Sequence, residues 1–113
     1  MLFDEERVRV FVYQEPIDMR SGFERLSYYV REVFGEDLLE GHMFLFLGKN
    51  RRRAKVLFFD HTGLILLTKR LEGGRLMAIS ELEFVQEITI SELKFLLSGS
   101  LLRFADRRKI KVA

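Results

Sequence analysis

The sequence lacks cysteine and tryptophan altogether and has a single proline among its 113 residues. Without cysteine the chain can form no disulfide framework, offer no thiol nucleophile and build no cysteine-ligated zinc site. No apolar run approaches the roughly 20 residues of a membrane span, and the first ten residues, MLFDEERVRV, are too acidic to resemble a signal peptide. We therefore expect a cytoplasmic protein that has no membrane partner.

The length suits one domain, and 48% of the residues are hydrophobic, so a core can form without a metal ion or a disulfide. We expect a single domain over residues 1–113, with a core at about 8–99 and a basic tail at 103–113. The net charge is only +2, but the charges are clustered. Acidic residues gather at 36–40 and 81–87 and basic residues at 49–55, and such clusters say more about partners than the total does.

The first half of the chain predicts one strand followed by one helix. Arg9–Gln14 alternates and is rich in β-branched and aromatic residues, which is typical of a strand. The period then becomes helical and predicts a helix over Arg20–Phe34 that ends at Gly35 in a left-handed turn. Two residues could cap its start, Asp18 or Ser21.

The second half predicts a meander and a short helix. His42–Leu47 and Lys55–Asp60, separated by GKNRRR, indicate a hairpin, and Leu64–Leu71 and Arg75–Ile79 follow after turn signals. Ser91–Gly99 predicts a helix capped by Ser91, whereas 80–90 permits either a helix or a strand. The expected fold class is α+β, a mainly antiparallel meander of four to five strands against one main helix, with a second short helix at the C-terminal end.

Both faces of the predicted sheet are apolar, so the sheet needs two covers. The main helix supplies one, and the short C-terminal helix is the candidate for the other. If it leaves part of that face bare, the exposed apolar patch predicts a homodimer or another protein interface; the alternative is that the two helices suffice. The residues expected to be buried are Phe23, Leu26, Val30, Phe44, Phe46, Leu57 and Phe58.

The basic stretch 49–55 contains no acidic residue and joins two apolar strands. A two-stranded ribbon can enter a major groove, and arginine binds phosphate in a bidentate manner. A solvated hairpin tip and an acidic patch on a protein partner are the alternatives. The candidate nucleic-acid-binding residues are Lys49, Asn50, Arg51, Arg52, Arg53, Lys55, Lys69, Arg70 and Arg75.

The sequence gives little support for catalysis. Asp18, Asp60 and Glu72 are the acids that could form a metal-binding nuclease triad, but their spacing does not require one. His42 and His61 lack a metal-ligand motif such as HExxH. We expect no enzymatic activity, no catalytic residues, no metal and no cofactor.

Three stretches in order, PIDMRSGFERL, then EGHMFLFLGKNRRRAKVLFFDHTGLILLTKRLEGGR, then SELKFLLSG, resemble TnpB of the insertion-sequence family numbered 66. The family-motif residues are Asp18, Met19, Arg20, Asp60 and Gly63. Members often carry tryptophan just before the aspartate and again after the glycine-arginine hairpin. This chain has Phe59 and Met77 at those positions.

The resemblance implies an accessory protein of DNA transposition in a bacterial cytoplasm, which acts beside a separate transposase. With the basic stretch, it favours a non-catalytic DNA-binding protein whose partners are DNA, in particular the ends of the element, and the other proteins of that element. The alternative is a protein scaffold of the transposition complex that does not touch DNA.

Overall fold

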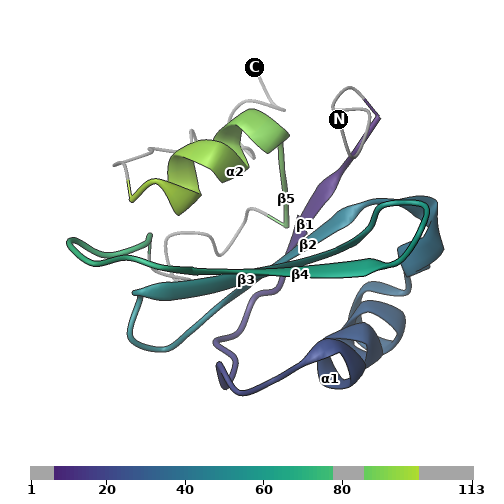
Figure 1. The fold of residues 1–113 in the computed structure, drawn as a ribbon, viewed down its shortest axis with the longest axis horizontal. Coiled ribbons are helices and arrows are strands. Elements are labelled where there is room, and N and C mark those ends of the chain that lie inside the picture. Colours follow the sequence, from purple (N-terminus) through teal and green to yellow (C-terminus); the bar gives the residue numbers. More distant parts are fainter. Residues whose placement is uncertain (1–6, 78–85, 100–113) are drawn as a thin grey trace, which may run out of the picture.

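A computed structural model of the chain describes residues 7–77 and 86–99, and it shows a five-stranded sheet with a helix on each face (Figure 1). The fold is a single α+β domain, as the sequence predicts. Across those two ranges no helix is long and apolar enough to span a membrane. In chain order the elements are β1 (Val10–Val12), α1 (Phe23–Tyr29), η1 (Val30–Phe34), η2 (Leu38–Glu40), β2 (Met43–Leu47), β3 (Arg53–Phe59), β4 (Leu64–Arg70), β5 (Glu87–Ile88) and α2 (Ile90–Leu97).

The sheet has the strand order β4-β3-β2-β1-β5. Two of the predicted antiparallel pairings are confirmed, because β3 pairs antiparallel with β2 and with β4. The sheet is thus mainly antiparallel, as predicted, whereas β1 joins it by a parallel pairing with β2 that the sequence did not predict. The segment that holds α1 carries the chain from β1 back to the start of β2, and such a crossover is what a parallel pair requires.

The fifth strand lies in the segment 80–90, for which a strand is one of two predicted alternatives, and not at Arg75–Ile79. β5 pairs antiparallel with β1, whereas Arg75–Met77, the described part of the predicted strand Arg75–Ile79, has no strand structure. Leu76 instead exchanges hydrogen bonds with Arg51. The rest of that predicted strand, most of the ambiguous segment 80–90 and the basic tail 103–113 lie outside the described residues.

The main helix has two parts, an α-helix and a π-helix. The α-helix α1 begins after Gly22, which gives no side-chain cap, so neither Asp18 nor Ser21 caps it. The π-helix η1 follows and ends at Gly35 in the predicted left-handed conformation, with φ of 65°. The wider π turn shifts the helical phase, and Val33 within it is 58% exposed. Phe23, in the first turn of α1, is 45% exposed, so its predicted burial is wrong.

Each face of the sheet holds its own buried cluster. On the α1 face the cluster comprises Ile17, Leu26, Val30, Phe44, Phe46 and Leu57. The cluster on the α2 face joins β1–β3 and β5 to α2 and to two residues of the loop after β4, Leu71 and Leu76. All the residues predicted to be buried, except Phe23, are buried. Both covers therefore exist, and the loop after β4 helps α2 to supply the second.

Candidate nucleic-acid interface

The turn between β2 and β3 is built from its own backbone and one side chain. Gly48 N–H donates to the Arg53 carbonyl at 3.0 Å, and Arg51 N–H donates to the Gly48 carbonyl at 3.3 Å. Asn50 Oδ1 accepts from Arg52 N–H at 3.0 Å, which is a local Asx turn. Asn50 is exposed, and its side-chain oxygen shapes the turn from which the basic side chains extend.

Arg51 faces inward and fastens a second loop to this turn. Its backbone lies in the left-handed region with φ of 62°, and its Nε donates to the Leu76 carbonyl at 2.9 Å. Leu76 N–H donates back to the Arg51 carbonyl, and Leu71 N–H donates to the Arg52 carbonyl at 2.7 Å. The loop after β4 is therefore held against the turn, and this brings the exposed Arg75 to the same end of the molecule.

Lys55 does not fit the predicted role in DNA contact. It lies on the α1 face of β3, where it is 9% exposed, and its Nζ donates to the Ser21 carbonyl at 2.7 Å. The ammonium thus satisfies a backbone acceptor at the approach to α1. We therefore correct the predicted set of contact residues by removing Lys55.

Six basic side chains remain exposed at this end of the sheet, and we call them the basic surface: Lys49, Arg52, Arg53, Lys69, Arg70 and Arg75. Strand register decides their directions. Arg53 lies directly opposite Arg70, and Ala54 lies opposite Lys69. Because neighbouring residues of a strand point to opposite faces, Arg70 is on the α1 face of the sheet and Lys69 is on the α2 face. Within the described residues, Arg70 pairs with Glu72 at 2.9 Å.

The first family-motif stretch lies against this turn. Ile17 forms a parallel bridge with Gly48, and a Cβ atom on Gly48 would come within 3.1 Å of Met19 Cγ. Between them is a hollow of about 500 Å³, lined by Pro16, Ile17, Asp18, Met19, Lys49, Asn50 and Arg53. The structure thus brings together Ile17 and Gly48, which are 31 residues apart in the sequence.

Asp18 and Arg20 pair with each other at the protein surface. Arg20 Nη2 lies 2.7 Å from Asp18 Oδ2, and the Arg20 side chain is 90% exposed. Arg20 therefore forms its ion pair at the surface and not in the core. The pKa of Asp18 is held well below its ordinary value by hydrogen bonds from Arg20. The side-chain bonds have the largest effect, and the bond from the backbone N–H has the next largest.

Asp60 and Gly63 form the turn between β3 and β4, at the opposite end of the hairpin from the basic surface. Asp60 Oδ1 accepts from the Thr62 hydroxyl at 2.8 Å and from the backbone N–H groups of Thr62 and Gly63. These hydrogen bonds lower the pKa of Asp60, and the bond from the Thr62 hydroxyl has the largest effect. The three acids considered as a triad each have a local partner: Asp18 pairs with Arg20, Asp60 accepts from Thr62, and Glu72 pairs with Arg70. Within residues 7–77 and 86–99, no group of three possible ligands could hold a metal ion.

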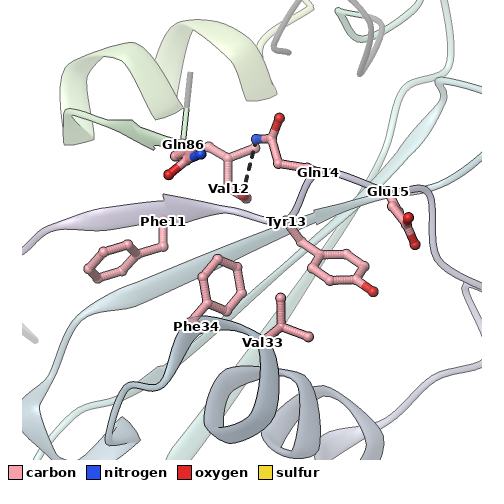
Figure 2. Close-up of a pocket in the computed structure, with 8 residues that line it drawn as sticks. All are labelled: Phe11, Val12, Tyr13, Gln14, Glu15, Val33, Phe34 and Gln86. Carbon is pink, nitrogen blue, oxygen red and sulfur yellow. Dashed lines mark hydrogen bonds between the residues drawn. The ribbon is translucent and has the colours of Figure 1, made fainter. Parts of the chain in front are cut away.

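A second hollow, of about 510 Å³, lies between β1 and η1, and sequence reasoning missed it (Figure 2). Figure 2 shows Phe11, Tyr13 and Phe34 directed toward the space between the strand and the helix. The ring centroids of Phe11 and Phe34 are 5.9 Å apart, and burial is the main cause that raises the pKa of Tyr13. The lining is mainly aromatic and apolar, with Glu15 as its one acidic residue among those described, so the hollow is an open side of the aromatic core.

Comparison with known proteins identifies the family. The family described as "IS66 Orf2 like protein" (TnpB_IS66) matches residues 8–107. "Uncharacterized protein y4hO" of Sinorhizobium fredii (strain NBRC 101917 / NGR234) is 37% identical over 99 residues, which cover 88% of this chain and 86% of that protein. "Uncharacterized protein y4jC" of the same strain is 26% identical over 111 residues, or 98% of this chain and 95% of that protein. No solved structure gives a significant match. The chain therefore belongs to the family of IS66 Orf2-like proteins, which are associated with transposition.

Proposed function

We propose that this protein is a non-catalytic accessory protein of transposition that binds DNA, and that its basic surface contacts backbone phosphates at the ends of the element. Family membership supports the process and supports a role beside other proteins of the same element, above all a separate transposase. The position and charge of the basic surface support the contact with DNA.

One observation carries the proposal, the direct opposition of Arg53 and Arg70. Opposed like charges on neighbouring strands destabilise a sheet. Arg70 pairs with Glu72, which offsets part of this repulsion. Two guanidinium groups held side by side form a natural receptor for phosphate, which each can bind with two hydrogen bonds. Lys49 and Arg52 extend the same positive region along the turn.

The position of the basic surface in the fold also suits a duplex. Figure 1 shows the β2–β3 turn and the loop after β4 together at one end of the sheet, and the β3–β4 turn at the other end. A projecting β-ribbon is narrow enough for the major groove of B-DNA. Contacts with phosphate orient a protein on DNA without reading its sequence, so we expect general affinity for duplexes from this surface.

The test is the salt dependence of binding by a variant with Lys49→Ala, Arg52→Ala and Arg53→Ala. Each phosphate contact adds about 0.9 to the slope of log affinity against log salt, so the variant's slope should be smaller by up to about 2.7. Its affinity should fall similarly for element ends and for unrelated duplexes. Electrophoretic or fluorescence titration at several salt concentrations measures both quantities.

A charge-matched control separates a local contact from a general loss of charge. Arg7, Arg31 and Lys94 are exposed and lie outside the basic surface, so their triple alanine variant should keep the parental slope. If both variants bind as the parent does, the proposal is wrong. If the first variant then also fails to support transposition, the turn serves a protein partner and the scaffold hypothesis holds.

A further inference from the structure

β4 is an edge strand that pairs along one side only. It is the first strand in the order of the sheet, and among the described residues no strand pairs with its outer side. It is seven residues long, LILLTKR, and two of its leucines are exposed, Leu64 by 39% and Leu67 by 51%. A long apolar edge can pair with another chain, and proteins normally shorten, cover or charge such an edge.

The hydrogen bonds of the β3–β4 hairpin show which residues of β4 face outward. Leu71 N–H donates to the Arg52 carbonyl, and Asp60 N–H donates to the Gly63 carbonyl. The pairing alternates along an antiparallel ladder, so the odd-numbered residues of β4 bond to β3. The even-numbered residues therefore present their N–H and C=O groups to the open side: Leu64, Leu66, Thr68 and Arg70.

We propose that the outer edge of β4 binds the β4 strand of a second copy of this chain, antiparallel, about a twofold axis at Leu67. In this register Leu66 lies opposite the partner's Thr68, and Leu64 lies opposite the partner's Arg70. Each of the four residues whose backbone groups face outward then lies opposite such a residue of the partner. Each of these pairs can therefore form both of its backbone hydrogen bonds. Leu67 meets the partner's Leu67 on the axis, as a pair whose side chains are close together.

The distribution of charge along β4 favours a second copy of this chain as the partner at its outer edge. Both cationic residues of β4, Lys69 and Arg70, lie at its C-terminal end. At its N-terminal end Leu64 borders a hollow of about 710 Å³ that is also lined by Glu36 and Asp37 and by the basic residue Arg31, so that among the described residues its rim has an excess of negative charge. Antiparallel pairing places the cationic end of each copy beside the acidic rim of the other, twice by symmetry. It also keeps the two cationic ends apart, along strands of roughly 20 Å.

Besides the Leu67 pair on the axis, the same hollow supplies a second apolar contact to the dimer interface. Leu39, from η2, is 63% exposed and lines the hollow with Phe59 and Leu64. The aliphatic stem of the partner's Arg70 can lie across these residues. An isologous interface of this kind closes after two subunits, and it gives one continuous sheet with a basic surface at each end.

The first experiment is sedimentation velocity of the chain without DNA, over a range of concentrations. We expect a reversible species of twice the 13.4 kDa of one chain. Leu67→Glu and Leu67→Lys should each abolish it, because equal charges then meet on the axis. An equimolar mixture of these two variants should restore it. Val33→Glu is the matched control, since Val33 is also exposed, by 58%, and lies on η1; it should leave the dimer intact.

The second experiment uses the absence of cysteine from the chain. A Leu67→Cys variant should form a disulfide between two chains under mild oxidation, because closely opposed side chains on neighbouring strands lie near the Cβ separation that a disulfide needs. Val33→Cys should not do so at the same concentration. A monomer at all concentrations would overturn the proposal, as would a dimer that survives Leu67→Glu or a mixture that stays monomeric while circular dichroism shows both variants folded.

Discussion

Side chains with the same charge have different roles within the stretch 49–55. Arg53 is exposed on β3, Arg51 bonds to the Leu76 carbonyl, and Lys55 bonds to the Ser21 carbonyl. The sequence predicts the basic stretch but not these roles. They depend on acceptors that lie 25 and 34 residues away in the chain and that only the folded structure brings near.

The assignment of Lys55 to stability can be checked with Lys55→Met. Loss of the ammonium leaves the buried carbonyl of Ser21 without this donor, so we expect the free energy of unfolding to fall by about 1–3 kcal/mol. The salt slope of DNA binding should not change. Arg53→Ala should instead leave the free energy of unfolding within about 0.5 kcal/mol of the parent and lower the salt slope of DNA binding by about 0.9.

Urea unfolding and salt titration of the same two proteins measure both effects. A Lys55→Met variant that is as stable as the parent but binds DNA with a lower slope would contradict the assignment. It would place the ammonium on the DNA.

At the scale of elements, periodicity predicted that the helices exist, whereas their ends depend on single hydrogen bonds. The predicted cap of the last helix, Ser91, is wrong. The Thr89 side chain accepts from Glu92 N–H at 3.1 Å, and the Glu92 carboxylate accepts from Thr89 N–H at 2.8 Å. This is a capping box, and its signal, T-x-x-E, is legible in the sequence. The π turn of η1 has no comparable sequence signal.

The two candidate caps of α2 can be compared directly by mutation. Thr89→Ala should lower the free energy of unfolding by about 1 kcal/mol, because it removes the acceptor of the box. Ser91→Ala, inside the first turn and exposed, should change it by no more than about 0.5 kcal/mol. Thermal unfolding followed by circular dichroism ranks the two variants. A larger loss in Ser91→Ala would mean that α2 begins two residues later than the structure shows.

At the scale of the whole molecule, local signals predicted the antiparallel hairpins but not how the two halves of the chain join. A hairpin is encoded by a short loop between apolar strands, as in Met43–Leu47 and Arg53–Phe59. The parallel pairing of Val10–Val12 with Met43–Leu47 has no local signal, because it depends on where α1 packs. Two-sided burial was predictable, since Phe44, Leu45 and Phe46 leave neither face of β2 polar.

The basic surface likewise has a part that local sequence predicts and a part that depends on the folded structure. Lys49, Arg52 and Arg53 could be predicted from one stretch of sequence. Their proximity to Lys69 and Arg70 follows from the hairpin register, whereas Arg75 reaches them through the bonds between Leu76 and Arg51. The contact between the motif residue Met19 and Gly48 depends on the parallel pairing, so the sequence could not predict it.

Because one sheet carries both buried clusters, we expect the two faces to unfold together. Leu96 of α2 is 2% exposed, and Leu96→Ala should cost about 2–5 kcal/mol. All three tyrosines of the chain, Tyr13, Tyr28 and Tyr29, belong to β1 and α1 or adjoin them, and two of them pack against the cluster on the α1 face. Tyrosine fluorescence therefore reports on the face opposite the mutation. In a two-state domain the midpoint from fluorescence should shift as far as the midpoint from circular dichroism. A fluorescence midpoint that stays at its parental value while the other falls would show that α2 and its cluster unfold separately, and that the second cover is an independent unit.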